Sequence, residues 1–344
     1  MSAFAAAVRL KREAAPIEAH RTPEGWTEML LLRSLPDLAP GDAELHESLR
    51  AKCGRHNCII WGRTRRAEFG PYPETLSIRA VWGGTQYCHL SGRTVAVDDD
   101  SFLILNQGRI YSTSIRANHA VESLTLCFQP SLVSMVCSDV DDSLDQALAR
   151  GGSVAEHSPE FIENLQAHEN TVSPILRFIR AHLWRGVVDE AWYEEQMVFL
   201  LERMRCRQRK VLQQIDQLAL IRPATRREVH RRVSLATDFL LTHYVEGVDL
   251  GTLASMAYLS KFHFLRLFRL IHGVTPREFL QRKRLDAALR LLSTTQLTIK
   301  EVTASVGFAY ESTLLRHVRS RTMLTPRQIR TRSPTGAAFA ITAR

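Results

Sequence analysis

Residues 253–276 of this chain read LASMAYLSKFHFLRLFRLIHGVTP, and residues 302–326 read VTASVGFAYESTLLRHVRSRTMLTP. The second stretch repeats the pattern of the first, with one inserted residue near its middle. After that insertion the offset between matched positions is constant at 50 residues. The matched positions are Leu253 and Val302, Ala257 and Val306, Leu259 and Phe308, Phe264 and Leu314, Arg266 and Arg316, Arg269 and Arg319, and the Thr-Pro pairs at 275–276 and 325–326.

Each copy carries the local signals of two short helices joined by a turn. Asp249 and Ser260 are suited to N-cap the two helices of the first copy, because their side-chain oxygens accept hydrogen bonds from free backbone amides. Gly273 suits the left-handed end of the second helix. Pro276 suits the start of a connecting helix to about Leu292, which at 1.5 Å per residue is roughly 25 Å long. We therefore predict two helix-turn-helix units held apart by a rigid helix.

The second helix of each copy holds the side chains that would read DNA in the major groove. Phe264 and Phe268 are four residues apart and should face the core. Leu314 and Val318 occupy the same positions in the second copy. The exposed positions, which we predict to contact DNA, are Lys261, Phe262, Leu265, Arg266 and Arg269 in the first copy and Glu311, Ser312, Leu315, Arg316 and Arg319 in the second.

These residue types suit contacts with DNA. Arginine forms two hydrogen bonds with guanine or binds phosphate, and Leu265 and Leu315 offer apolar contacts to thymine methyl groups. Glu311 is suited either to accept a hydrogen bond from cytosine or to favour the N-terminus of its own helix. The alternative, a solvated charged face of a helical bundle, explains one such helix but not two at matched offsets.

Basic residues are concentrated in the same region. Residues 230–332 hold 17 Lys and Arg against 7 Asp and Glu, a net charge of +10, and the rest of the chain sums to −1 (28 minus 29). This asymmetry predicts a polyanionic partner, double-stranded DNA, for the C-terminal part alone. No apolar run is long enough to cross a membrane, and no secretory signal begins the chain, so a cytoplasmic location is expected.

Residues 229–330 resemble the AraC/XylS family of bacterial transcription regulators. The residues that match the family's motifs are Leu253-Ala254, Leu259-Ser260, Phe264, Arg266, Phe268-Arg269, Gly273, Thr275-Pro276, Phe279, Arg284-Leu285, Ala288, Leu291-Leu292, Ile299, Glu301-Val302, Val306-Gly307-Phe308 and Thr325-Pro326.

The resemblance implies a sequence-specific regulator, usually an activator that contacts RNA polymerase. It also implies an N-terminal cupin-like domain that binds a small-molecule effector, followed by helices that form a homodimer. The second copy departs from the family pattern, which has Phe at positions 314 and 318, Ala at 303 and Gly at 323. Leu314, Val318, Thr303 and Met323 stand there, so we expect the second unit to be less stable, and its DNA contacts more degenerate, than the first.

The N-terminal half fits this order. Short apolar or alternating runs between residues 56 and 128, separated by Gly, Pro, Asp and Asn turns, predict a β sandwich or barrel. Helical periodicity follows, with helices expected at 161–165, 175–183 and 190–220. The predicted fold class is α+β, with this cupin-like domain and its dimerisation helices followed by an all-α double helix-turn-helix domain. The predicted boundaries are an irregular lead-in at 1–50, the sensor and dimerisation domain at 51–220, a linker at 221–228, the DNA-binding domain at 229–332 and a disordered tail at 333–344.

The effector would meet inward aromatic and polar groups of the β domain. The candidates are Trp82, Tyr87, His89, Arg109 and Tyr111.

Three other functions remain open from the residues. An enzymatic cupin needs closely spaced histidines and a carboxylate around a metal, whereas His89 and His119 each stand alone, so no enzyme, metal or cofactor is expected. A metal or thiol sensor would use Cys53, His56 and Cys58, although their spacing is not a recognised zinc pattern. A constitutive or nucleoid-type DNA binder would use the N-terminal half only to dimerise.

Overall fold

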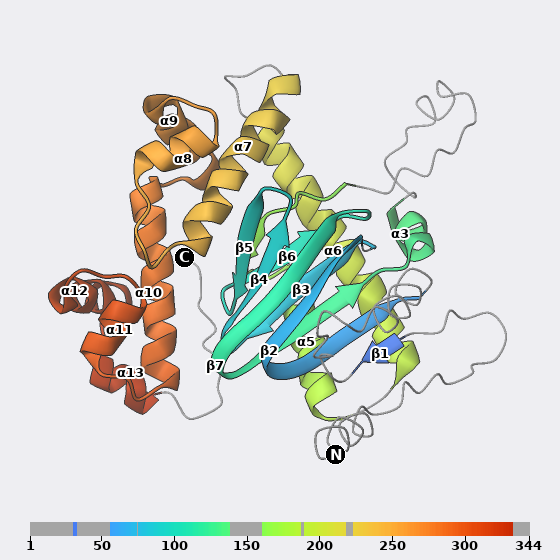
Figure 1. Cartoon of the computed structure of the whole chain (residues 1–344), viewed down its shortest axis with the longest axis horizontal. Coiled ribbons are helices and arrows are strands. Elements are labelled where there is room, and N and C mark those ends of the chain that lie inside the picture. The colour runs from blue at the N-terminus through green and yellow to red at the C-terminus, as the bar shows by residue number, and fades with distance from the viewer. Residues whose placement is uncertain are drawn as a thin grey trace, which may run out of the picture. The chain divides into compact units, whose positions relative to one another are not determined.

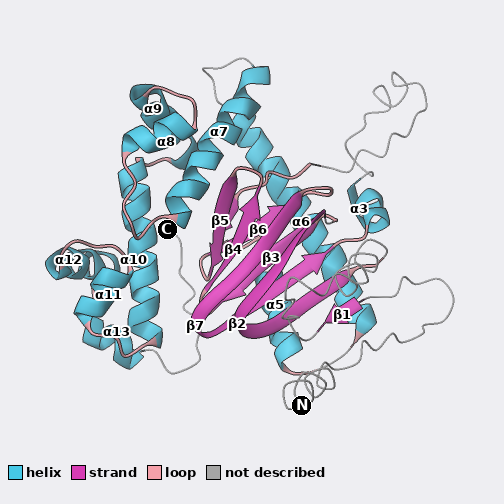
Figure 2. Ribbon diagram, viewed as in Figure 1, coloured by secondary structure: helices cyan, strands magenta, loops and turns pink. Residues whose placement is uncertain are grey.

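The computed structural model describes residues 30–32, 56–73, 75–137, 160–186, 189–217 and 223–332. The chain divides into two compact units, residues 1–214 and residues 215–344, which we call the barrel unit and the helical unit. Figures 1 and 2 show strands in the first and helices alone in the second. The predicted fold class is confirmed. The predicted tail at 333–344 lies outside the described residues, as does the predicted lead-in except for one short strand.

The barrel unit is built on one eight-stranded, nearly closed sheet. Its main path runs in the order β1-β2-β7-β3-β6-β8, with β4 joining β7 and β5 joining β4. All pairs are antiparallel except β1 with β2. The strands are β1 (Leu30–Leu32), β2 (Cys58–Pro73), β3 (Ser77–Trp82), β4 (Thr85–Leu90), β5 (Arg93–Asp98), β6 (Ser101–Leu105), β7 (Ile110–Cys127) and β8 (Leu165–Ala167).

Strand β7 is one continuous strand of 18 residues, although polar residues interrupt its apolar pattern near the middle. The middle residues 117–120, including His119, lie at a register shift, and they stay within one strand because β2 pairs with β7 on both sides of it, at Thr64 with Val121 and at Arg66 with Arg116. Arg66 pairs with Arg116, and Glu68 forms an ion pair with Arg116 on the exposed side. Cross-strand pairing therefore extends the strand through a segment whose composition favours a turn.

Residues 161–165 were expected to form a helix, and this prediction is wrong. Leu165 instead begins β8, which pairs with β6 opposite Leu103. The preceding segment is fixed by the side chain of Asn106, which donates to the Phe161 carbonyl and accepts from the Phe161 amide, both at 2.8 Å. A long-range polar contact thus overrides the apolar spacing that predicted a helix.

Among the described residues of this unit, three helices accompany the sheet: α3 (Pro130–Cys137), α5 (Ser173–Trp184) and α6 (Glu190–Asp216). Buried residues of the strands and of α5 and α6, including Phe102, Leu176 and Leu200, form one apolar core. Glu122 of β7 joins α5 to the sheet, because its carboxylate accepts hydrogen bonds from Arg180 and from Trp184. Burial raises the pKa of Glu122, but bonds from Arg180 and Trp61 outweigh it and lower the pKa overall.

The helical unit continues with α7 (Pro223–Thr242), α8 (Leu250–Met256), α9 (Lys261–His272), α10 (Pro276–Thr294), α11 (Ile299–Ser305), α12 (Glu311–Thr322) and α13 (Pro326–Arg332). Helix α7 begins at Pro223, inside the predicted linker at 221–228. A proline suits this position, because its missing amide is not needed in a first turn. No helix in the described ranges is long and apolar enough to cross a membrane.

Candidate nucleic-acid interface

The first helix-turn-helix unit consists of α8 and α9. Asp249 caps α8 by accepting from the amides of Gly251 and Thr252, and Ser260 caps α9 by accepting from the amide of His263 at 3.3 Å. Phe264 and Phe268 are fully buried against α7 and α8 in the first core of the helical unit. Burial of these two rings fixes which face of α9 meets solvent.

The second unit consists of α11 and α12. Thr298 and Glu301 form a reciprocal capping box at the start of α11, the arrangement in which both side chains satisfy free amides. Leu314 and Val318 are fully buried in a separate core with Val302. The predicted inward positions of both copies are therefore confirmed, and the two units have separate cores joined by α10.

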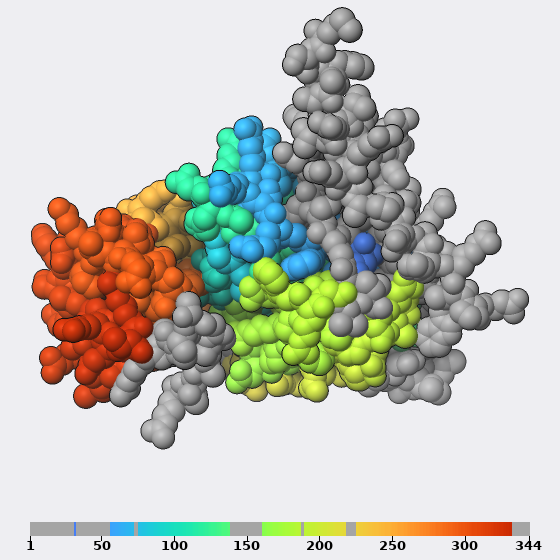
Figure 3. Space-filling model, turned by 90° about the horizontal axis from the view of Figure 1, so that it is seen from below, coloured from blue at the N-terminus to red at the C-terminus, as the bar shows by residue number. Residues whose placement is uncertain are grey.

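The outward faces of α9 and α12 carry the predicted contact residues. Nine of the ten are exposed, with Phe262 at 78% and Leu315 at 37% of full exposure, and Leu265 is half-buried. Arg266 and Arg269 on α9 match Arg316 and Arg319 on α12. Figure 3 shows one face of the helical unit, with the residues of the second helix-turn-helix copy in red. Each helix thus offers solvent a face on which arginines flank apolar or small side chains.

Tyr244 and Val245, just after the end of α7 at Thr242, form a joint between the two helix-turn-helix units. Arg284 of α10 donates to the Tyr244 carbonyl at 2.6 Å and to the Val245 carbonyl at 3.3 Å. The ammonium of Lys283, a buried residue, lies 5.3 Å from the centre of the Tyr244 ring. Gly307 packs so closely that a Cβ there would lie 2.2 Å from the Val245 carbonyl oxygen. Three contacts from the second half of the domain therefore converge on one point of the first.

Each unit uses two left-handed backbone positions, one in the turn and one after the second helix. The first unit has Tyr258 (φ 53°) in the turn and Gly273 (φ 73°) at the helix end. The second unit has the reverse order of residue types, Gly307 (φ 79°) and then Met323 (φ 59°). Left-handed backbone is costly for residues with a Cβ, so each unit has one relaxed and one strained position.

Two histidines lie where α7 packs against α9: His230 of α7, which is buried, and His272 of α9, which is half-buried. Burial lowers the pKa of His230 to about 4. Burial, with a smaller effect of the nearby His230, lowers the pKa of His272 to about 4. The His272 ring accepts or donates a hydrogen bond with the Thr237 hydroxyl at 3.1 Å and packs beside Phe268. Both rings are therefore neutral at physiological pH and act as core residues.

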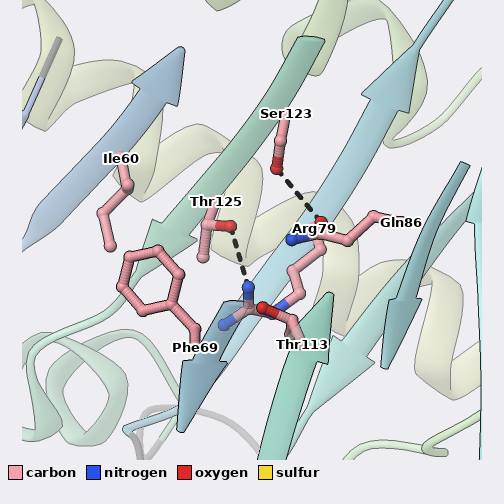
Figure 4. Close-up of a pocket in the computed structure, with 7 residues that line it drawn as sticks. All are labelled: Ile60, Phe69, Arg79, Gln86, Thr113, Ser123 and Thr125. Atoms are coloured by element: carbon pink, nitrogen blue, oxygen red, sulfur yellow. Dashed lines mark hydrogen bonds between the residues drawn. The ribbon is translucent and has the colours of Figure 1, made fainter. Parts of the chain in front are cut away.

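The barrel unit contains a small pocket lined by residues of four strands. Arg79 of β3, only 4% exposed, lies at its centre with its guanidinium 4.6 Å from the Tyr111 ring centre. It donates to the Thr125 hydroxyl at 3.1 Å and also to the Tyr111 hydroxyl. Figure 4 shows the pocket, with Ser123 donating to Gln86 at 3.1 Å. Its lining residues are Ile60, Phe69, Arg79, Gln86, Thr113, Ser123 and Thr125.

Only one predicted effector residue, Tyr111, reaches the surroundings of this pocket. Tyr87 and His89 point outward, because β4 alternates and its inward positions are Gln86, Cys88 and Leu90. The other two are engaged elsewhere: Trp82 lies under the Arg180 guanidinium at 4.5 Å, and Arg109 pairs with Glu163. Arg79 was missed, although a lone arginine inside the apolar run of β3 was a usable signal.

The described residues bring together no group of three or more His, Cys, Asp or Glu suited to a metal ion. Of the proposed sensor residues, Cys53 lies outside the described part of the chain. Cys58 is fully buried and lies opposite Cys127 in the ladder of β2 and β7. Neither Cys58 nor Cys127 forms a disulfide.

Comparison with known proteins identifies the helical unit. A family model described as "Helix-turn-helix domain" matches residues 253–332. The C-terminal domain of this chain is an AraC-type helix-turn-helix domain.

Two curated relatives match in this domain. They are the probable transcriptional regulator LumQ of Photobacterium leiognathi (31% identical over 78 residues, 23% of this chain and 32% of LumQ) and the bifunctional transcriptional activator/DNA repair enzyme AdaA of Bacillus subtilis (30% over 98 residues, 28% of this chain and 46% of AdaA). The match thus spans a third to a half of each relative's own length. The solved DNA-binding domain of AdpA, in complex with a target DNA, is 32% identical, with 29% of this chain and 90% of that chain covered and a TM-score of 0.28.

Proposed function

We propose that this protein is a sequence-specific, DNA-binding transcription regulator. The observation that carries the proposal is the duplicated exposed face on α9 and α12, each backed by its own core and each presenting two matched arginines. Helix α10 has 19 residues, about 28 Å at 1.5 Å per residue. Two recognition helices joined in this way suit successive major grooves, which lie about 34 Å apart on one face of DNA.

The test is genome-wide mapping of binding sites with the full chain and with Arg266→Ala and Arg316→Ala. We expect a shared motif of two short elements about one helical turn apart. Each variant should weaken operator binding by roughly 1–3 kcal/mol if its arginine contacts a base, and Arg266→Ala should cost more because its unit keeps the fuller motif. Diffuse binding without a motif, collapsing as salt is added, would support a constitutive or nucleoid-type binder instead.

We propose further that the barrel unit senses a small-molecule effector and that the protein is an activator. A buried arginine beside hydroxyl and amide groups favours a ligand that carries a carboxylate or a similar anion. The relevant groups are Arg79, Thr113, Thr125 and Gln86. Calorimetric titration of the full chain with a panel of small carboxylates should find saturable binding that Arg79→Met abolishes. A panel without any saturable ligand would count against this part of the proposal.

The remaining partners are proposed from the order of the domains, in which a β domain and its helices precede the DNA-binding domain. Helix α6 would mediate a homodimer, and DNA-bound protein would contact RNA polymerase. Sedimentation of the full chain at several concentrations tests the dimer, and transcription reconstituted with purified polymerase tests activation. No enzymatic activity is proposed.

A further inference from the structure

The first residue of α12 has the opposite charge to its counterpart in α9. Glu311 stands at the position that Lys261 occupies in the first unit, after the constant offset of 50 residues. Both side chains are exposed at the start of their helices. The exposed faces of α9 and α12 therefore carry matched arginines, but the charges of their first residues are opposite. The N-terminal residues of such a helix contact base edges in the major groove.

Glu311 differs from the other carboxylates of the DNA-binding domain. Across the described residues 223–332, each of the others engages another group through a hydrogen bond, ion pair or electrostatic interaction. Glu311 has no such partner within this range. The N-cap residue Tyr310 also makes no side-chain capping bond, so no local network holds the Glu311 carboxylate in place.

A free carboxylate is unfavourable on a surface that faces DNA, because phosphates repel it. It becomes favourable where it accepts a hydrogen bond from a base. In the major groove only cytosine presents an amino donor without an acceptor on the same base edge, since adenine adds N7 and guanine and thymine present acceptors. We infer that Glu311 selects a cytosine in the half-element read by α12. Lys261 favours guanine or phosphate at the equivalent position, so the two half-elements differ and the protein binds its site in one direction.

The inference rests on the proposed function and is tested by selection from a randomised double-stranded DNA library. The full chain would be compared with Glu311→Gln, Glu311→Ala and the control Glu301→Gln. Glu301 lies in the capping box of α11, where glutamine also serves, so the control removes the same charge away from the recognition face. Wild type should prefer cytosine at one position of one half-element by roughly 5- to 150-fold.

The variants should change that position and leave the other half-element unaltered. Glu311→Gln should move the preference to adenine, with which an amide forms two hydrogen bonds. Glu311→Ala should remove the preference, and Glu301→Gln should retain the wild-type motif. An unchanged motif in Glu311→Ala, even with higher affinity for all sequences, would overturn the inference while leaving the proposed function intact. No enriched motif with wild type would overturn the proposed function, and the inference with it.

Discussion

Replacing Gly307 with alanine should weaken the joint between the two helix-turn-helix units, and Gly273→Ala is the matched control. The two glycines have nearly the same φ, +79° and +73°. An alanine held in left-handed backbone therefore lowers the free energy of unfolding by a similar amount at both positions, about 1–2 kcal/mol. It also restricts the unfolded chain equally in both variants.

The surroundings of the two positions differ. A Cβ at Gly273 meets nothing within 4 Å, whereas a Cβ at Gly307 would lie 2.2 Å from the Val245 carbonyl oxygen and 2.9 Å from its carbonyl carbon. These are backbone atoms that cannot rotate away, so the chain must shift. Overpacking of this kind costs typically 1–3 kcal/mol. We expect Gly273→Ala to destabilise the domain by about 1 kcal/mol and Gly307→Ala by about 2–4 kcal/mol.

Amide hydrogen exchange of the full chain, resolved by peptide, is the suitable assay. All five tryptophans, at positions 26, 61, 82, 184 and 192, precede the helical unit in the sequence, so intrinsic tryptophan fluorescence does not report directly on this domain. The slowest-exchanging amides of α11 and α12 give the free energy of opening of the second unit. Equal losses in the two alanine variants would refute the steric argument and leave only the backbone cost.

Three further predictions concern stability. Met323→Gly should stabilise α12 by about 1 kcal/mol, because glycine adopts left-handed backbone without strain and Met323, 81% exposed, makes little packing contribution. The amides of α12 should exchange more slowly in this variant, and unchanged exchange would contradict the prediction. Tyr310→Ser should add about 1 kcal/mol by restoring the N-cap that Ser260 supplies in α9, and a loss of helix protection would show that the tyrosine has another role. The pKa values of His230 and His272 are lowered to about 4 in the folded state, so the unfolded chain takes up protons at a higher pH than the folded chain. The contribution of these rings to the free energy of unfolding should therefore be constant above about pH 6.5. It should fall by up to roughly 3 kcal/mol for each ring between pH 6.5 and 4, and level off below. Urea unfolding followed by circular dichroism across this range should show a shallower slope for His272→Gln, and equal slopes would contradict the assignment.

The sequence by itself determined the helical unit almost completely. Its signals are local: caps at Asp249 and Ser260, a left-handed glycine at 273, and apolar spacing that decides which face of a helix is buried. The residues that make these interactions are only a few positions apart, so the sequence alone predicts their geometry. The repeat then supplied the one long-range fact that was needed, the equivalence of the two units.

Tertiary structure decided what depends on contacts between distant residues. The ladder with β2 makes β7 one strand, and the Asn106 contacts turn 161–165 from an expected helix into the approach to β8. Strand alternation identified the sheet as amphipathic but could not say which residues converge on one pocket, so Arg79 was missed and Tyr87 was wrongly placed inside. The close approach of Gly307 to Val245 likewise follows from packing across α10. Local propensity predicts most of the helices and strands. Which residues become neighbours is known only from the folded structure, because burial and cross-strand pairing act between positions far apart in sequence.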